Sequence, residues 1–176
     1  KEGAFITKCT AQLMRDFGSI QSPQNAFLLN LGLESLHVRM QRHCQNGLAV
    51  AKYLASDPRI AWVKYPSLEG DKDYELAKKY CPEGTCGVVS FGVKGGRKAA
   101  EEFMKGLKIV AIETHVADAR SCCLHPASST HRQLTDKELV DAGVSPDLVR
   151  LSCGIENSQD LIDDIKQALD NACIDA

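Results

Sequence analysis

One arginine stands inside an apolar run of β-like sequence in the C-terminal part of the chain. The run L-V-R-L-S-C places Arg150 between Val149 and Leu151. Burying an unpaired guanidinium costs several kcal/mol or more, so a cation here needs an anion or contact with water. In a strand, Arg150 and Ser152 share one face while Val149 and Leu151 share the other. The Arg150 face therefore either is solvated or fronts a cleft that receives an anion.

A second group of reactive residue types precedes this run. It comprises His115, Asp118, Arg120, His125, Ser128, Ser129 and His131. Serine, histidine and aspartate are the components of a hydrolytic triad. However, no G-x-S-x-G motif places a serine on the sharp turn that such a nucleophile needs. We therefore expect these residues to form hydrogen bonds in loops, and His125 to end a strand that turns into a loop at Pro126.

The eight cysteines do not form a recognisable metal or redox motif. Neither Cys81 with Cys86 nor Cys122 with Cys123 has the C-x-x-C spacing of zinc or thioredoxin sites. Adjacent cysteines on a strand also point to opposite faces. We therefore expect reduced packing thiols and no metal site.

Length and composition restrict the class of protein. The chain has 176 residues, a net charge of −2 and 44% hydrophobic residues, enough for one domain or one domain with a piece of another. No block of like charges indicates nucleic acid or a membrane surface as a partner. No apolar run reaches the roughly 18 residues of a membrane span, and the start lacks the apolar core of a signal peptide. These features predict a cytoplasmic protein, and the missing initiator Met indicates a chain cut from something longer.

The elements that would position Arg150 follow from hydrophobic periodicity and capping residues. Helices are predicted at 11–17, from the Ser22-Pro23 start to the Asp57-Pro58 stop, at 74–80, 97–107 and 135–142, and after a Ser158 cap. Strands are predicted at 60–65, 88–93, 109–116, 122–125 and 148–155. This order predicts an α/β or α+β fold with a four- or five-stranded sheet, helices on one side and a long helix in front.

Three stretches of the sequence together resemble one enzyme family. They are S-P-Q-N-A-F-L-L-N-L-G-L-E-S-L-H-V-R-M, D-A-R-S-C-C-L-H-P-A-S-S-T-H-R-Q-L-T and V-R-L-S-C-G-I-E-N-S-Q-D-L-I-D-D-I. In this order and spacing they resemble the C-terminal part of the pyridoxal-phosphate enzymes of Cys/Met metabolism, and within that family the O-acetylhomoserine sulfhydrylases. The resemblance covers practically the whole chain.

The resemblance implies the small C-terminal domain of a fold-type I pyridoxal-phosphate enzyme. Residues 1–25 would be the tail of a large cofactor domain, and residues 26–176 the linking helix and the small domain. Arg150 falls on the arginine that holds the substrate α-carboxylate, and its two parallel N–H groups suit two carboxylate oxygens. His115 also falls in the substrate site, where His115-Val116-Ala117-Asp118 replaces the Asn-Val-Gly-Asp that relatives commonly have.

The sequence departs from the family at the catalytic lysine. The Schiff-base lysine lies in a Ser-x-Thr-Lys motif, which this chain lacks, and Lys8 in I-T-K-C has no such serine. The aspartate at the pyridine nitrogen, the stacking tyrosine and the main phosphate contacts would also lie upstream. The resemblance therefore implies no catalytic and no cofactor-binding residue in this chain, which we expect to be inactive and free of cofactor by itself.

The resemblance also implies the activity of a longer parent enzyme. With pyridoxal phosphate, the parent would convert O-acetylhomoserine and sulfide or a thiol to homocysteine or methionine and acetate. Its partners would be the amino-acid substrate, the upstream large domain and further copies in a dimer or tetramer. A methionine γ-lyase or a cystathionine-processing enzyme of the same family is one alternative. A non-catalytic binding or assembly domain with the same fold is another.

Overall fold

The computed structural model describes residues 3–172 and divides the chain into two compact units, Lys1–His37 and Val38–Ala176. The first unit is helical: α1 (Ala4–Lys8), the π-helical turn η1 (Cys9–Met14), α2 (Arg15–Phe17) and α3 (Pro23–Glu34). Gly18 ends α2 in the left-handed region at φ 65°. The helical run begins at Ala4 rather than residue 11, because the β-branched Ile6 and Thr7 weaken the helix pattern of the first turns.

The predicted long helix is present as two successive helices, α3 and α4 (Leu36–Ser56), separated by one residue. The predicted cap is confirmed, because the Ser22 hydroxyl accepts a hydrogen bond from the Asn25 amide at 3.2 Å. Ser35 interrupts the run with φ −102° and ψ 2°. Serine favours such breaks because its hydroxyl competes for nearby backbone groups.

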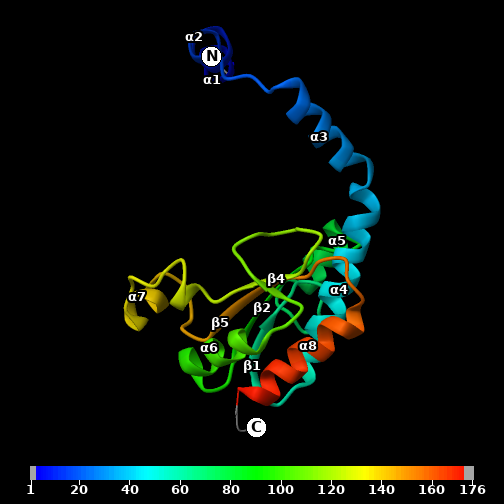
Figure 1. Ribbon diagram of the computed structural model, residues 1–176, viewed down its shortest axis with the longest axis vertical. Coiled ribbons are helices and arrows are strands. Elements are labelled where there is room, and N and C mark those ends of the chain that lie inside the picture. Colours follow the sequence, from blue (N-terminus) through cyan, green and yellow to red (C-terminus); the bar gives the residue numbers. More distant parts are fainter. Residues whose placement is uncertain (1–2, 173–176) are drawn as a thin grey trace. The chain divides into compact units, whose positions relative to one another are not determined.

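The second unit contains a five-stranded sheet in the order β1-β2-β5-β4-β3. Strands β1, β2, β4 and β5 of this sheet are labelled in Figure 1. The strands are β1 (Ile60–Lys64), β2 (Val88–Val93), β3 (Ala111–Ile112), β4 (Cys122–Leu124) and β5 (Leu148–Ser152). Every neighbouring pair is antiparallel except β3 with β4. Two predicted strands are too long, since 109–116 keeps only two strand residues and 148–155 ends at Ser152. Edge strand β3 pairs only with β4, whose three residues limit the ladder that β3 can form.

The remaining helices connect or cover the strands. They are α5 (Tyr74–Tyr80), α6 (Gly96–Gly106), the 3-10 turn η2 (Pro126–Ser128), α7 (Asp136–Asp141) and α8 (Ser158–Asn171). A capping box begins α7, with Thr135 and Glu138 bonded to each other's backbone amides. The predicted Ser158 cap of α8 is wrong. Asn157 has the extended backbone of an N-cap, and its side chain accepts a hydrogen bond from the Gln159 amide, so Ser158 is already helical.

The hydrophobic core lies on one face of the sheet. This face carries Val89, Phe91, Val149, Leu151 and Cys123, all buried. The apolar stripes of α4, α6 and α8 belong to the same core cluster: Val50, Ala51 and Leu54; Ala100, Phe103 and Met104; Leu161, Ile165, Ala168 and Leu169. The predicted alternation of β5 is thus confirmed, with Val149 and Leu151 inward and Arg150 on the other face.

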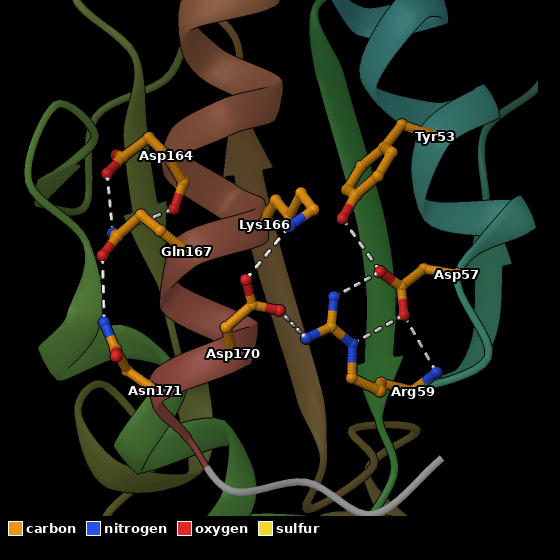
Figure 2. A network of polar contacts seen from close by, with 8 residues as sticks. All are labelled: Tyr53, Asp57, Arg59, Asp164, Lys166, Gln167, Asp170 and Asn171. Carbon is orange, nitrogen blue, oxygen red and sulfur yellow. Dashed lines mark hydrogen bonds and ion pairs between the residues drawn. The ribbon is translucent and has the colours of Figure 1, made fainter.

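A polar network joins the end of α4, the turn before strand β1 and helix α8 (Figure 2). Asp57 accepts hydrogen bonds from Tyr53 Oη at 2.9 Å and from Arg59 Nε and Nη2 at 2.9 and 2.7 Å. Arg59 Nη1 donates to Asp170 Oδ1 at 2.5 Å. These bonds to Arg59 lower the pKa of Asp57 to about 2, and its side chain is only 5% exposed. The network therefore joins segments that lie far apart in the sequence.

We predict that Asp57→Asn lowers the free energy of unfolding by about 2 kcal/mol at pH 7. A pKa lowered from 3.8 to about 2 corresponds to this amount. The contribution is complete above the unfolded-state pKa near 3.8 and is lost as the pH falls toward 2. Urea denaturation of both proteins at pH 7, 4 and 3 measures the difference, which should shrink over that range.

Asp141→Asn is the matched control, because Asp141 is exposed at the end of α7. Its effect should stay within about 0.5 kcal/mol at each pH. An Asp57→Asn protein that is as stable as the wild type at pH 7 would contradict the prediction.

Candidate functional site

Arg150 lies in the central strand, on the face of the sheet opposite the core. Its register partners are Ser90 on β2 and Leu124 on β4. Ser90 in turn pairs with Lys64 on β1, so these four residues form one row across four strands. Lys64 is exposed, while Arg150 and Ser90 are half-buried. Because cross-strand neighbours lie on the same face, this row places two cations, two strands apart, on the face that the core leaves open.

The guanidinium of Arg150 is only partly used by the chain itself. Its Nη2 donates one hydrogen bond to the carbonyl oxygen of Thr114 at 2.8 Å. Among residues 3–172, no carboxylate forms an ion pair with Arg150. A guanidinium has five N–H donors in a planar fork, so the remaining donors can meet an anion from outside. A carboxylate fits best, because its two oxygens match two parallel N–H groups.

The loop of residues 113–120 is fixed against the Arg150 face through its backbone. The Ala117 amide donates to Ser152 Oγ at 2.9 Å, and Cys122 Sγ lies 3.0 Å from the carbonyl oxygen of His115. Cys122 and Ser152 are register partners on β4 and β5. Arg150 adds the third contact, to Thr114. These contacts were not predicted, since they join residues that are far apart in sequence. The sequence pattern predicted only that Arg150 and Ser152 share one face of the strand.

The loop ends at a small polar cluster around Ser121. Glu156 accepts hydrogen bonds from the Ser121 amide at 2.7 Å and from its hydroxyl at 2.8 Å. The same hydroxyl accepts a bond from the Gly154 amide at 2.7 Å. Gly154 must be glycine, because an added Cβ would lie 2.3 Å from the carbonyl oxygen of Ala119. The end of the loop and the segment after β5 are therefore packed backbone against backbone.

Helix α4 holds that segment from the other side. His43 Nδ1 donates to the carbonyl oxygen of Cys153 at 2.7 Å, because a carbonyl can only accept. The Asn46 amide donates to the carbonyl oxygens of Gly154 and Glu156, both at 2.9 Å. Both side chains are only 1% exposed. Two buried polar side chains on an apolar helix face thus fix the chain directly after Arg150 and Ser152.

His115, the second predicted substrate-binding residue, lies on the exposed part of the loop. Its side chain is 64% exposed, with Nδ1 3.2 Å from Glu113 Oε2 and 3.8 Å from Asp118 Oδ2. The structure joins His115 to the Arg150 face through its carbonyl oxygen and its neighbour Thr114. A direct role for the imidazole at the substrate stays a prediction.

The serines and histidines near η2 do not form a hydrolytic triad among residues 3–172. His125 is buried, with Nε2 2.9 Å from the Pro146 carbonyl oxygen and Nδ1 2.8 Å from Ser128 Oγ. The carbonyl requires a proton on Nε2, so the Ser128 hydroxyl donates to Nδ1. In a hydrolytic triad, a carboxylate accepts the hydrogen bond from the second imidazole nitrogen. In His125 a backbone carbonyl oxygen accepts it instead. His125 therefore fixes the turn at Pro126, as the sequence predicted.

Among residues 3–172, no lysine lies in a buried position that would suit a Schiff base with pyridoxal phosphate. Every lysine among residues 3–172 is exposed, including Lys8 on α1. A lysine that forms a Schiff base with this cofactor needs a desolvated site that makes its amine reactive. In the same range, no three His, Cys, Asp or Glu side chains are grouped to hold a metal ion. What the site offers is an anchored guanidinium beside a fixed loop.

The chain is similar to proteins of one enzyme family. The family profile described as "Cys/Met metabolism PLP-dependent enzyme" matches residues 2–170. The chain is 46% identical to the O-acetyl-L-homoserine sulfhydrylase of Leptospira meyeri, over 96% of this chain and 38% of that protein. It is 44% identical to the homocysteine synthase of Schizosaccharomyces pombe, over 96% of this chain and 39% of that protein.

A solved structure shares the fold as well as the sequence. It is a Campylobacter jejuni protein provisionally named O-acetylhomoserine (thiol)-lyase, crystallised with N'-pyridoxyl-lysine-5'-monophosphate. The TM-score is 0.85 at 40% identity, over 94% of this chain and 39% of that chain. The present chain thus spans about two fifths of the length of the relatives that it matches. Within residues 3–172, none of the helices combines the length and the hydropathy that a membrane span needs.

We predict that Ala117→Gly raises the free energy of unfolding by about 1 kcal/mol. Ala117 has φ 60°, where a Cβ costs roughly 1 to 2 kcal/mol and glycine costs nothing. Part of this gain in stability is offset, because glycine increases the conformational entropy of the unfolded chain. Urea denaturation at pH 7 measures the change.

Ala119→Gly is the matched control in the same loop, because Ala119 does not have a positive φ. It should lower the free energy of unfolding by about 0.5 kcal/mol through the unfolded state alone. Equal effects of the two glycine substitutions would show that the Ala117 backbone is not strained.

Proposed function

Since this chain belongs to the Cys/Met-metabolism family of pyridoxal-phosphate-dependent enzymes, we propose that it is the C-terminal part of an O-acetylhomoserine sulfhydrylase. The parent enzyme would convert O-acetylhomoserine and sulfide or a thiol to homocysteine or methionine, with release of acetate. Pyridoxal phosphate, the cofactor of the family, withdraws electrons from the substrate carbon skeleton in such reactions. The names of the relatives, O-acetyl-L-homoserine sulfhydrylase and homocysteine synthase, support this reaction.

The part that this chain plays is to bind and orient the substrate carboxylate. The observation that carries this proposal is the half-buried Arg150, which has a backbone carbonyl partner and no ion-paired carboxylate within residues 3–172. Thr114 fixes one edge of the fork, so the remaining N–H groups are oriented before substrate arrives. A fork held in this way loses little side-chain entropy on binding. An α-amino acid supplies the matching anion.

The loop of residues 113–120 forms the side of the proposed site next to the clamp. His115 lies on this loop, whose carbonyl and amide groups contact Cys122, Arg150 and Ser152. We assign His115 to the substrate side of the loop, where its exposed imidazole can contact the bound amino acid. Histidine here replaces the amide side chain common in relatives, so this contact would distinguish the present enzyme from them.

The first unit supports the proposal that the chain belongs to a larger protein. Its helices and the segment between α2 and α3 expose large apolar side chains, with exposed fractions between 50% and 79%: Phe5, Ile6, Phe17, Ile20, Phe27, Leu28, Leu29, Leu31 and Leu33. Apolar patches of this kind are typical of interaction surfaces. In the parent enzyme, the upstream large domain and a second copy of the chain would cover them. A cytoplasmic location of this enzyme stays a prediction.

The upstream sequence and the reaction products test this function. The gene should encode a Ser-x-Thr-Lys motif before residue 1, and the purified parent should form homocysteine from O-acetylhomoserine and sulfide. A methionine γ-lyase would instead release methanethiol from methionine, and a cystathionine-processing enzyme would cleave or form cystathionine. A parent without the lysine motif and without activity on any of these substrates would indicate a binding or assembly domain.

We predict that Arg150→Lys in the parent enzyme lowers kcat/KM by roughly ten- to a hundredfold. An ammonium keeps the charge but loses one of the two parallel hydrogen bonds, which is worth about 1.5 to 3 kcal/mol. Steady-state kinetics with O-acetylhomoserine measures the loss. The absorption spectrum of the bound cofactor checks that the cofactor site is intact.

The thermal midpoint of Arg150→Lys should change much less than the rate, because Arg150 lies outside the buried core. If the variant keeps the wild-type kcat/KM, then Arg150 does not bind the substrate carboxylate. A large fall in the midpoint together with the rate would instead make Arg150 a structural residue.

We also predict that the 176-residue chain by itself forms no specific Schiff base with pyridoxal phosphate, because every lysine described is exposed. Borohydride reduction followed by peptide mass spectrometry should show only low, scattered modification of several lysines. A stoichiometric adduct on one lysine would contradict this prediction.

A further inference from the structure

Helix α4 carries a buried histidine that is bonded to the residue after strand β5. His43 is 1% exposed, and its Nδ1 donates to the carbonyl oxygen of Cys153 at 2.7 Å. The Cys153 amide donates in turn to the carbonyl oxygen of Gly87, which directly precedes β2, at 2.8 Å. Both backbone groups of Cys153 are therefore bonded, one to the segment before β2 and the other to α4.

The backbones of these segments are in direct contact at Gly87. A Cβ added there would lie 2.8 Å from the Cys153 carbonyl oxygen, 3.2 Å from His43 Cβ and 3.3 Å from the His43 carbonyl oxygen. Because Gly87 has no side chain to hold the segments apart, the spacing between α4 and the end of β5 depends on the His43 bond.

Only one nitrogen of the His43 ring is used. The other nitrogen, Nε2, is buried and has no hydrogen-bond partner among residues 3–172. In the neutral ring, the proton that Nδ1 donates leaves Nε2 as an acceptor without a donor. An unpaired buried polar atom lowers the stability of the fold. Stability alone therefore does not account for an imidazole at this position, and the Nδ1 bond is the polar contact that it provides.

The Cys153 bond lies next to the side chains through which β5 contacts the substrate-side loop. Cys153 directly follows Ser152, whose Oγ accepts a hydrogen bond from the Ala117 amide. Arg150, two residues before Ser152 on the same face, donates to the Thr114 carbonyl oxygen. Both contacts depend on where the end of β5 lies, since both side chains move with the strand.

We propose that His43 is a positioning residue for Arg150, because its bond to Cys153 fixes the end of β5 and so sets the direction of the guanidinium. His43 acts through the backbone and does not contact the substrate. The direction matters because two parallel N–H groups meet two carboxylate oxygens only when the fork is aligned. A misplacement of about 1 Å can lower a rate roughly a hundredfold. This inference rests on the proposed function, since it requires that Arg150 binds the substrate carboxylate.

Two substitutions of His43 in the parent enzyme separate the hydrogen bond from the packing. The side-chain nitrogen of asparagine is two bonds from Cβ, as Nδ1 is in histidine, so His43→Asn keeps a donor for the Cys153 carbonyl oxygen. His43→Leu fills a similar volume without a donor. We expect kcat/KM for O-acetylhomoserine to fall about tenfold in His43→Leu and to stay within about twofold of the wild type in His43→Asn.

A glutamine variant keeps the test decisive if the leucine variant does not fold. The side-chain nitrogen of glutamine is one bond further from Cβ, at the distance of Nε2, so His43→Gln moves the donor away from the Cys153 carbonyl oxygen. It should show the same loss of about tenfold in kcat/KM. Thermal melting of each holoenzyme identifies the variants that fold.

A double-mutant cycle tests whether the effect passes through Arg150. In an Arg150→Lys background, His43→Leu should lower kcat/KM by less than about twofold, because the fork that it positions is already lost. Tyr53→Phe is the matched control. It removes the hydrogen bond of another α4 side chain, from Tyr53 Oη to Asp57, about 15 Å further along the helix. It should leave kcat/KM within about twofold of its starting value in both backgrounds.

The outcomes distinguish this inference from the proposed function. A wild-type kcat/KM in His43→Leu, or in the glutamine variant that replaces it, would overturn the inference. An equal loss in His43→Asn, or a full tenfold loss in the Arg150→Lys background, would also overturn it. These results leave the proposed function intact as long as Arg150→Lys by itself lowers kcat/KM. An Arg150→Lys enzyme with wild-type kcat/KM would contradict the proposed function, and this inference with it.

Discussion

A single positive charge in the central strand of the sheet is the constraint on which the arrangement around it depends. Arg150 has Ser90 and Leu124 as its neighbours in register, and neither can neutralise a guanidinium. The chain instead supplies one backbone carbonyl, that of Thr114. Because a carbonyl satisfies one donor and leaves the charge unneutralised, the guanidinium keeps its affinity for an anion. An ion pair with a carboxylate of the same chain would have neutralised the charge and removed this affinity for an anion.

The loop that supplies the carbonyl depends on contacts further away. The segment that leads into the loop, residues 108–110, is held by Asp164 on α8. This buried carboxylate accepts hydrogen bonds from the amides of Lys108, Ile109 and Val110 at 2.9 to 3.0 Å. The end of the loop is held by Glu156, which accepts two hydrogen bonds from Ser121. Charge-assisted bonds to backbone amides are strong and directional, so they fix short irregular segments that hydrophobic packing alone would leave undefined. Helix α8 and the segment before it therefore position the loop of residues 113–120.

Strain and tight packing concentrate in the same region. Ala117 has a left-handed backbone, and Gly154 allows backbone contact that any side chain would block. Such features persist only where the surrounding bonds determine the conformation, and they are common next to binding sites. The core, in contrast, uses ordinary helix stripes and strand alternation. The molecule thus combines a regular apolar scaffold on one face of its sheet with an irregular, hydrogen-bonded surface on the other.

The sequence by itself determined the elements whose signal is local. The Ser22-Pro23 start of a helix and the alternation of strand β5 around Arg150 were predicted, because caps and periodicity involve residues a few positions apart. The motifs also indicated the family. Tertiary structure alone decided the short β3, the break at Ser35 and the Asn157 cap, where neighbouring alternatives differ little in local energy. It also decided that Arg150, Ser152 and Cys122 hold the loop of residues 113–120. Contacts between residues that are far apart in sequence depend on strand order and register, which local pattern does not encode.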